Sequence, residues 1–452
     1  MASGSQGNDG TFTSVFFTTL EDLIANHSEP DTGKRQRIQP KRAAGKRIPN
    51  PSYRLYDNDE RKYYDDLGED ERVAIASLET KIKQMNKEEI PLRFKVLTSN
   101  MDEKIKAIAV KQLGYLYDLD SSSSEFYKLR NWVDNLCKLP IGKFVHLPVS
   151  KSSSISEIRG FLQGVKSKLD ETVYGHKEAK HAIQCLLAQW ISNPLSKGLV
   201  IGIQGAMGCG KTSLIKNGVC QALGLPFAFV SLGGASDGSY LDGHSYTYEG
   251  STWGKIVSIL MQAGCMNPVM YFDELDKVSA TYKGDEIINN LIHLTDSTQN
   301  DKYQDKYFVG VEFDLSRCLL IFSYNDETLI NPILRDRMVR IKTDGYGIDD
   351  KVEIAKQYLI KELSEQFKYT DEQLIFSNAI IRYMINNKVP EEKGVRNLKR
   401  AIEAIMSNIN LNALLQPSDI EFPVVIDEKM VDKYVKHQDV FDLPSQTRSM
   451  YI

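Results

Sequence analysis

The clearest chemical signal in this sequence is a short glycine-rich segment, GAMGCGKT, which starts at Gly205 and ends at Thr212. Its spacing is G-x-x-x-x-G-K-[ST], in which the glycines let backbone N–H groups close around phosphates. Lys211 would reach the β- and γ-phosphates, and the Thr212 hydroxyl would bind Mg²⁺. We therefore predict a site for ATP and Mg²⁺ formed by Gly205, Ala206, Met207, Gly208, Cys209, Gly210, Lys211, Thr212 and Ser213.

Two adjacent carboxylates, Asp273 and Glu274, follow the apolar run Val269–Phe272. A strand that ends beside a phosphate loop would place both at the carboxyl edge of an open α/β sheet, where ligands bind. Asp273 would hold Mg²⁺, mostly through water, because Mg²⁺ keeps part of its hydration shell. Glu274 would polarise the water that attacks the γ-phosphate.

Three further polar side chains could complete such a site. Asn325 ends another apolar run and could orient the attacking water, although an Asn after a strand is also a common turn residue. Arg337 precedes the last apolar run and could face the γ-phosphate of a neighbouring subunit, where such arginines contribute roughly 10³–10⁵ in rate. Arg396 opens a helical segment and would reach the phosphates from there. Each arginine could equally form a surface ion pair.

Five apolar runs predict the strands that must position these groups, and they are 199–204, 226–232, 268–272, 318–324 and 338–342. The segments between them are long enough for right-handed crossovers, which predicts an α/β fold with a five-stranded parallel sheet and flanking helices. Leu214–Leu223 predicts the helix that leaves the phosphate loop. From Asp349 onward, apolar residues recur at helical spacing, with Leu374–Ile385 as one segment, which predicts a small helical lid.

The N-terminal part shows other patterns. Residues 1–60 are rich in Gly, Ser, Thr, Asp and Pro, which predicts a disordered tail. Within it, the strongly basic segment Lys34–Arg47 is a nuclear-import signal, a nucleic-acid contact or a solvated linker. A 3-4-3 spacing typical of a coiled-coil seam then links Ile75, Leu78, Ile82 and Met85.

The predicted organisation is thus a helical, coiled-coil-like segment ahead of a nucleotide-binding module and its lid. The expected domains are a basic tail (1–60), a helical domain (61–150), an α/β domain (151–345), a helical lid (346–438) and a C-terminal tail (439–452). The net charge of −4 neither favours nor excludes nucleic acid as a partner.

Compartment and membrane association follow from composition. The sequence holds no apolar run long enough for a transmembrane helix and no signal-peptide core, so we expect no membrane partner. The six cysteines are scattered, with no CxxC pair, which favours reduced thiols. We expect an intracellular, cytoplasmic protein, or a nuclear one if the basic segment directs import.

The order of these motifs resembles that of the AAA+ ATPases, and within them the Lon family, over residues 70–435. The matching strings are GAMGCGKTSL, FVSLGG (Phe229–Gly234), GHSYTYEG (Gly243–Gly250), NPVMYFDELDKV (Asn267–Val278), DRM (Asp336–Met338) and GVRNLKRAI (Gly394–Ile402). Upstream, RNWVD (Arg130–Asp134), LPIGK (Leu139–Lys143) and VYG (Val173–Gly175) are similar to the family's helical entry and linker.

The resemblance implies roles for individual residues. Arg337 resembles the arginine finger that acts on a neighbouring subunit, Arg396 the lid sensor, and Asn325 the sensor on the fourth strand. Tyr174 stands where the family's adenine pocket lies. Tyr248 is similar to the aromatic pore-loop residue that grips a threaded polypeptide.

The sequence departs from the Lon pattern at two places. Glu249 follows the pore tyrosine where the family has an aliphatic residue, and a ring of acidic residues would change how a polypeptide is held. Lon proteases continue into a domain with a Ser-Lys dyad, but no nucleophile–base pair can be assigned after Arg396.

We therefore expect a Lon-like AAA+ ATPase without its own peptidase. It would work as a homo-oligomeric ring, a hexamer, that unfolds or remodels protein substrates. The alternatives are a ring that acts on nucleic acid through Lys34–Arg47, and an ATPase partner of a separate protease.

Overall fold

The computed structural model describes residues 50, 52–85, 90–233, 235, 237–278, 281–370, 372–416 and 422–435. The basic segment Lys34–Arg47 and the expected C-terminal tail lie outside the described residues. Contacts divide the chain into two units, Met1–Glu89 and Ile90–Ile452. The domain boundaries expected from the sequence stay predictions.

In the first unit, the described residues form a short turn and two helices. They are η1 (Tyr53–Leu55), α2 (Asn58–Asp66) and α3 (Glu69–Met85). Asp57 caps α2, and the Glu60 carboxylate accepts from the Asp57 N–H at 2.7 Å, which completes a reciprocal capping box. Leu78 and Ile82 from the expected seam are 44% and 41% exposed on α3. The described part of this unit therefore leaves these two side chains uncovered.

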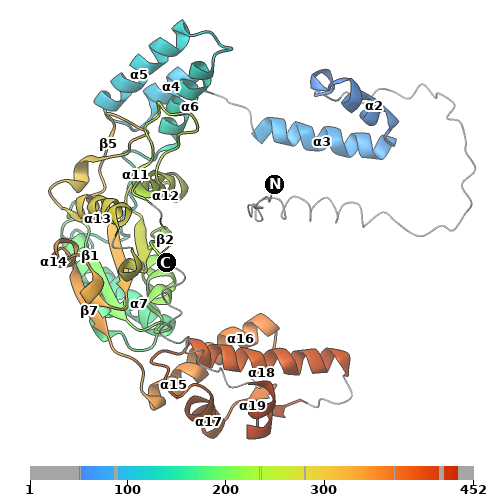
Figure 1. The fold of residues 1–452 in the computed structure, drawn as a ribbon, viewed down its shortest axis with the longest axis vertical. Coiled ribbons are helices and arrows are strands. Elements are labelled where there is room, and N and C mark those ends of the chain that lie inside the picture. Colours follow the sequence, from blue (N-terminus) through green and yellow to red (C-terminus); the bar gives the residue numbers. More distant parts are fainter. Residues whose placement is uncertain are drawn as a thin grey trace, which may run out of the picture. The chain divides into compact units, whose positions relative to one another are not determined.

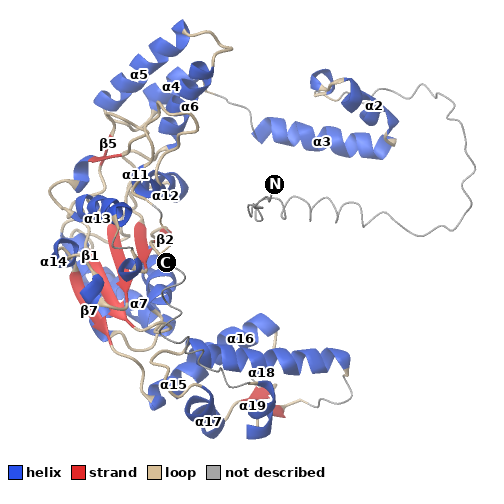
Figure 2. Cartoon of the chain, viewed as in Figure 1, coloured by secondary structure: helices blue, strands red, loops and turns tan. Residues whose placement is uncertain are grey.

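The second unit is built on a five-stranded sheet in the order β2-β3-β6-β1-β7 (Figures 1 and 2). Its strands are β1 (Val200–Gly205), β2 (Phe227–Ser231), β3 (Val269–Asp273), β6 (Leu319–Tyr324) and β7 (Val339–Thr343). Neighbouring strands are parallel throughout. The predicted five-stranded parallel sheet is confirmed. The prediction was possible because parallel strands that are covered on both faces are near-continuous apolar runs.

Helices cover both faces of this sheet (Figure 2). The main ones are α7 (Ile155–Thr172), α8 (Lys177–Ser192), the continuous helix α9–η2–α10 (Lys211–Leu223), α12 (Lys255–Ala263) and α13 (Tyr282–Thr295). Side chains alternate along β3, so Met270 and Phe272 pack in the core with α12 and α13. Val269 and Tyr271 pack on the other face in the core with α7 and α8.

Short elements connect the strands and helices of this domain. They are α11 (Ser239–Asp242), η3 (Leu275–Lys277), η4 (Asn300–Lys302), η5 (Glu327–Leu329), α14 (Pro332–Asp336) and the small antiparallel ladder of β4 (Tyr303–Gln304) with β5 (Glu312–Phe313).

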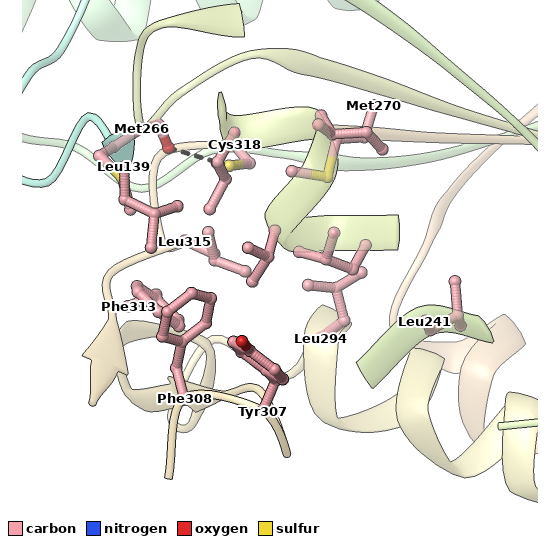
Figure 3. Close-up of a cluster of buried hydrophobic side chains, with 14 of the residues drawn as sticks. Leu139, Leu241, Met266, Met270, Leu294, Tyr307, Phe308, Phe313, Leu315 and Cys318 are labelled. Atoms are coloured by element: carbon pink, nitrogen blue, oxygen red, sulfur yellow. Dashed lines mark hydrogen bonds between the residues drawn. The ribbon is translucent and has the colours of Figure 1, made fainter. Parts of the chain in front are cut away.

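Three helices upstream of the sheet share its core. They are α4 (Leu92–Thr98), α5 (Glu103–Asp118) and α6 (Ser124–Lys138). The indole N–H of Trp132 on α6 donates to the Tyr307 carbonyl at 2.9 Å, and its ring lies 5.6 Å from that of Phe308. Figure 3 shows Leu139, next to α6, in the same buried cluster as Phe308 and Cys318. These helices are therefore held by apolar burial against the α/β domain.

The residues described after β7 form a helical lid (Figure 1). This lid has its own hydrophobic core. Its elements are α15 (Ile348–Ile354), η6 (Ala355–Leu359), α16 (Ile360–Phe367), β8 (Leu374–Ile375), α17 (Asn378–Lys388), α18 (Arg396–Leu415), β9 (Val424–Val425) and α19 (Glu428–Tyr434). The expected helix from Leu374 was placed too early, because Leu374–Ile375 pairs with Val424–Val425. The helix begins after Ser377, whose side chain accepts from the Ile380 N–H and caps it.

Candidate nucleotide site

The glycine-rich segment forms the loop between β1 and the helix that begins at Lys211. Gly208 and Gly210 have φ values of +76° and +79°, in the left-handed region that favours glycine. A Cβ at Gly208 would also lie 2.9 Å from the backbone nitrogen of Arg396. The loop therefore needs glycine at both places, and the helix N-terminus behind it favours bound anions.

The ammonium of Lys211 is folded into this loop. It donates to the Gly205 carbonyl at 2.5 Å, to the Ala206 carbonyl at 3.2 Å and to Asn325 Oδ1 at 3.3 Å. Burial lowers the pKa of Lys211, because the charged form loses hydration. Phosphate oxygens would offer this half-buried cation a stronger partner than neutral carbonyls do.

Asp273, at the carboxyl end of β3, has one carboxylate oxygen occupied by the protein. Its Oδ1 accepts from the Ser323 hydroxyl and from the Glu274 N–H, the latter at 3.1 Å. Ser323 lies on the neighbouring strand β6 and is only 1% exposed, so water does not compete for this bond. Among the described residues no hydrogen-bond donor reaches Oδ2, which is left to bind an ion.

The other predicted metal ligand, Thr212, is also held from behind. Its hydroxyl donates to the hydroxyl oxygen of Tyr271 on β3 at 3.2 Å. Tyr271 is fully buried, and its ring stacks on that of Phe229 with the centroids 6.0 Å apart. Burial raises the pKa of Tyr271, while hydrogen bonds with Ser323 and Thr212 partly oppose that rise. The hydroxyl of Tyr271 therefore stays protonated beside Thr212.

Glu274 turns the chain out of β3 with a φ of +60°, which is uncommon for a residue with a side chain. Its carboxylate lies against Gly233, just beyond β2. A Cβ at Gly233 would stand 2.3 Å from Glu274 Oε2. The glycine thus leaves the space that the carboxylate occupies, and a strained backbone of this kind is common at functional sites.

Asn325 follows β6 and is fixed through its backbone by Asp276. Asp276 Oδ2 accepts from the N–H groups of Asn325 and Asp326, both at 3.2 Å. Asp276 is only 7% exposed, so these bonds are largely shielded from solvent. Hydrogen bonds to Asp276 therefore fix Asn325 next to Lys211, in addition to the general preference of asparagine for turns.

The predicted groups line one cavity of about 320 Å³. Its lining includes Met207, Gly208, Cys209, Gly210, Lys211, Thr212, Ser213, Asp273, Glu274, Asn325 and Arg396. Gly205 and Ala206 contribute the carbonyls that hold Lys211. The structure thus brings together the phosphate loop, both carboxylates and the predicted sensor.

The donor set of this cavity suits Mg²⁺. The described residues contain no group of three or more His, Cys, Asp or Glu side chains that could hold a metal alone. Thr212 and Asp273 offer two oxygen ligands, and Mg²⁺ commonly takes one or two protein oxygens together with phosphates and water. A triphosphate in the same cavity would supply the missing oxygens.

The lid meets the cavity at the start of α18. The Val395 N–H donates to the Gly208 carbonyl at 3.2 Å. Gly394 lies so close to the loop that a Cβ there would be 2.2 Å from the Met207 carbonyl oxygen. Arg396, the first residue of α18, lines the cavity, as its predicted role requires.

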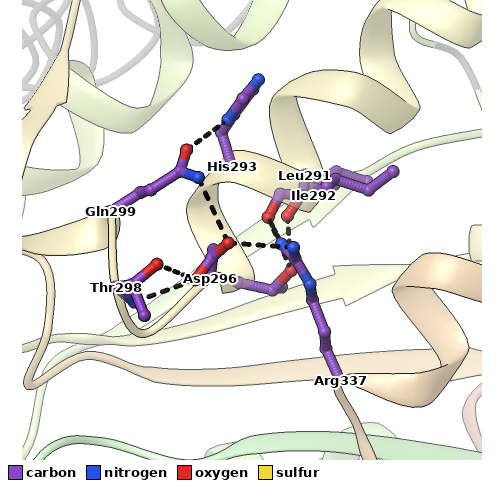
Figure 4. Close-up of polar contacts among 8 residues, drawn as sticks. Leu291, Ile292, His293, Asp296, Thr298, Gln299 and Arg337 are labelled. Carbon is purple, nitrogen blue, oxygen red and sulfur yellow. Dashed lines mark hydrogen bonds and ion pairs between the residues drawn. The ribbon is translucent and has the colours of Figure 1, made fainter.

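Arg337 lies outside that lining and is bound to the end of α13 (Figure 4). Its guanidinium donates to the Ile292 carbonyl and to Asp296 Oδ2, the latter at 2.9 Å. Asp296 Oδ1 also accepts from the Thr298 N–H at 2.9 Å and from the Thr298 hydroxyl at 2.7 Å. The arginine side chain is 27% exposed, so this network holds it in place without covering it.

Residues 201–345 match the family model described as "ATPase family associated with various cellular activities (AAA)". This segment contains β1 with its phosphate loop, Asp273 and Glu274, Asn325 and Arg337. It is an AAA ATPase domain. ATP and Mg²⁺ are what AAA ATPases bind, which agrees with the cavity described by the structure.

The chain is also related to Lon proteases. A Lon protease homolog of Acanthamoeba polyphaga mimivirus is 38% identical over 339 residues, which is 74% of this chain and 32% of that protein. Lon proteases of Desulfosudis oleivorans and Clostridium beijerinckii are 34% and 32% identical over 70% and 75% of this chain. This chain spans 37% and 42% of those two relatives, so the activities of the whole relatives do not carry over directly.

Tyr174 lies behind the phosphate loop of the AAA domain. Its hydroxyl donates to Asp350 Oδ1 at 3.0 Å, and its ring meets that of Tyr346 edge-on at 6.4 Å. Tyr346 and His176 both donate to the Cys209 carbonyl, at 2.8 and 2.5 Å. Tyr174 is thus linked to the loop and the lid, and its adenine-pocket role stays a prediction.

Tyr248 lies in the loop between α11 and α12 and is 68% exposed. The loop is closed at its base by a hydrogen bond from the His244 N–H to the Thr252 carbonyl at 3.1 Å. Its neighbour Glu249 is also exposed. The structure therefore presents an aromatic and an acidic side chain together, and their role in gripping a polypeptide stays a prediction.

Sequence reasoning missed four residues of this site. They are Tyr271, Ser323, Asp276 and Asp296, which contact Thr212, Asp273, Asn325 and Arg337. The one usable signal was the polar atoms of Tyr271 and Ser323 inside otherwise apolar strands, since buried polar groups need partners.

Among the helices that the structure describes, none has the length and apolar character of a membrane-spanning helix.

Proposed function

We propose that this chain hydrolyses ATP as one protomer of a ring, in which the neighbouring protomer completes each site. The main support for the proposal is that one charged residue of the predicted site lies apart from the others. Lys211, Asp273 and Glu274 line one cavity, whereas Arg337 is fastened to α13 outside that lining and stays partly exposed. A head-to-tail ring places one such surface against the other. The relation to Lon proteases supports a ring, with six protomers as the expected number.

The residues of one protomer would bind and align the reactants. Mg²⁺ held by Thr212 and Asp273 Oδ2 would neutralise charge on the β- and γ-phosphates. Lys211 would exchange its carbonyl partners for phosphate oxygens. The side chain of Arg396 would hold the phosphates from the lid, so nucleotide binding would also fix the start of α18.

Hydrolysis would then need a positioned water and a base. The water oxygen bonds to the γ-phosphorus while the bond to the β–γ bridging oxygen breaks. Glu274 takes the water proton, and the Asn325 amide, held by Asp276, orients the water. Arg337 of a neighbouring protomer stabilises the charge that develops on the phosphate oxygens.

We further propose that the cargo is a polypeptide gripped by Tyr248. Its support is the exposed ring of Tyr248, 68% accessible, on a loop with a closed base. A loop fixed at its base can transmit movement of the AAA domain to its tip. Glu249 beside it would favour segments with basic residues over acidic ones.

Two substitutions test the catalytic part. Glu274→Gln should bind ATP but not hydrolyse it. Arg337→Ala should also bind ATP with little loss, while its turnover falls by roughly 10³ or more. Arg335→Ala, two residues earlier on the same segment, serves as the matched control and should keep normal turnover. Normal turnover in Arg337→Ala would contradict the shared site.

A second experiment tests the cargo. ATPase activity is measured with an unfolded polypeptide and, separately, with single-stranded DNA. Polypeptide should stimulate the wild type, and Tyr248→Ala should lose that stimulation. Tyr115→Ala, which removes a tyrosine that is 52% exposed on α5, should keep it. Stimulation by DNA alone, unchanged in Tyr248→Ala, would instead favour action on nucleic acid.

A further inference from the structure

Two buried hydroxyl groups lie directly behind the two protein ligands expected for Mg²⁺. Tyr271 accepts from the Thr212 hydroxyl at 3.2 Å, and Ser323 donates to Asp273 Oδ1. Ser323 and Tyr271 also interact with each other through their side chains. Each of the two expected ligands is thus held from behind by a buried hydroxyl, one on β3 and one on β6.

We propose that Tyr271 and Ser323 are positioning residues that orient Thr212 and Asp273 for Mg²⁺. The inference rests on the nucleotide site of the proposed function, but it does not depend on a ring. It deepens that function by assigning part of the affinity of the site for the ion to two residues that hold the expected ligands in place.

The direction of the Thr212 hydrogen bond supports this role. A hydroxyl binds a cation through an oxygen lone pair, so its proton must point elsewhere. Tyr271 supplies the acceptor for that proton on the side of the sheet. A phenylalanine at this position would keep the ring but leave the Thr212 proton without that acceptor.

Ser323 orients the carboxylate of Asp273 in a similar way. With Ser323 and the Glu274 N–H on Oδ1, rotation of the Asp273 carboxylate would break two hydrogen bonds. Oδ2 is therefore kept available for the ion. Hydrogen-bond partners behind metal ligands commonly raise affinity by roughly 10–100-fold.

Both supporting hydroxyls are also held rigidly and away from water. Tyr271 is 0% and Ser323 1% exposed, so water cannot replace either hydroxyl. The parallel register pairs Phe272 with Phe322, which places the following residues, Asp273 and Ser323, at the same edge of the sheet. Stacking of Tyr271 on Phe229 fixes the ring that carries the hydroxyl.

The test measures binding of a fluorescent ATP analogue to the full chain, first in EDTA and then with increasing Mg²⁺. In the wild type, Mg²⁺ should tighten binding. Tyr271→Phe and Ser323→Ala should bind the analogue normally in EDTA but need about tenfold more Mg²⁺ for half of the tightening. Tyr303→Phe, which removes a hydroxyl bonded to the Leu241 carbonyl at 3.3 Å, should behave as the wild type.

Three outcomes would overturn the inference. One is an unchanged Mg²⁺ requirement in both variants. Another is loss of binding in EDTA, which would assign the hydroxyls to pocket folding. The third is wild-type binding that ignores Mg²⁺. One protomer suffices for this measurement. A normal turnover of Arg337→Ala would therefore contradict the proposal of a site shared between protomers, but it would not contradict this inference.

Discussion

Arg337 and Asp296 form an ion pair within one chain, with 2.9 Å between Arg337 Nη2 and Asp296 Oδ2. Asp296 is itself fixed by two hydrogen bonds from Thr298, and Gln299 adds a third at 3.3 Å. An arginine held in this way is already ordered before a neighbour arrives. It therefore loses less conformational freedom when it meets a phosphate.

Asp296→Asn should weaken that order. The amide of asparagine still accepts a hydrogen bond but carries no charge, and charge-assisted hydrogen bonds are roughly twice as strong as neutral ones, so turnover should fall about tenfold while ATP affinity stays normal. Steady-state ATPase rates and nucleotide binding check this expectation. Asp349→Asn breaks another aspartate–arginine pair, with Arg382 on the surface of the lid, and should leave turnover unchanged. Equal loss in both variants would show that the ion pair at Arg337 has no special role.

Asp276→Ala should uncouple Asn325 from the site. Two backbone N–H groups that now bond to Asp276 at 3.2 Å would lose their acceptor, at about 1–3 kcal/mol each. We expect a lower melting temperature and turnover reduced more than tenfold, with ATP binding retained. Asp314→Ala removes a side chain that accepts from the Ser316 N–H at 2.9 Å elsewhere in the domain. If that control lowered turnover as much, general destabilisation would explain the effect.

Gly233→Ala should displace the proposed base. The new methyl group would stand 2.3 Å from Glu274 Oε2, so the carboxylate must move. Hydrolysis should drop sharply, whereas binding of ATP, which depends on the phosphate loop, should persist. Gly114→Ala on α5 meets no atom within 4 Å, and should stabilise the protein by roughly 0.5–1 kcal/mol. Unimpaired hydrolysis in Gly233→Ala would remove Glu274 from its assigned place.

Asp305 should make stability depend on pH. Burial raises its pKa from 3.8 to about 6, with repulsion from Asp242 adding to the shift and backbone hydrogen bonds opposing it. Because the pKa of Asp305 is higher in the folded protein than in the unfolded chain, its protonated form stabilises the folded state. This stabilisation is fully present below the unfolded pKa of 3.8 and is lost as the pH rises through the folded pKa of about 6. Between pH 5 and 7 the wild type should lose about 1 kcal/mol more than Asp305→Asn. Urea unfolding of both proteins at pH 5, 6 and 7 would measure the difference, and a constant gap would contradict the assignment.

The strands and the phosphate loop could be predicted because their signals are local. Apolar runs such as Val269–Phe272 have few alternatives in a chain of this kind, and Gly208 and Gly210 stand where positive φ is required. The carboxylates Asp273 and Glu274 end such a run, so their edge of the sheet was also predictable. The start of α17 was placed too early because β8 pairs with β9, which is distant in sequence.

The supporting residues could not be predicted because their partners are far away along the chain. Asp276 is one acidic residue among many until the fold brings Asn325 to it. Tyr271 fits an apolar run equally well as a packing residue, and only its contact with Thr212 shows what its hydroxyl does. The pairing of Arg337 with Asp296 likewise depends on how α13 packs beside the segment before β7.

Mixing two inactive variants tests the shared site most directly. A Glu274→Gln protomer still offers its Arg337, and an Arg337→Ala protomer keeps its own Glu274. In rings mixed at random in equal amounts, about one interface in four would pair an intact Glu274 with a neighbour's intact Arg337. ATPase activity of the mixture should therefore rise well above that of either variant alone. A mixture no more active than the average of its two components would contradict a site built from two protomers.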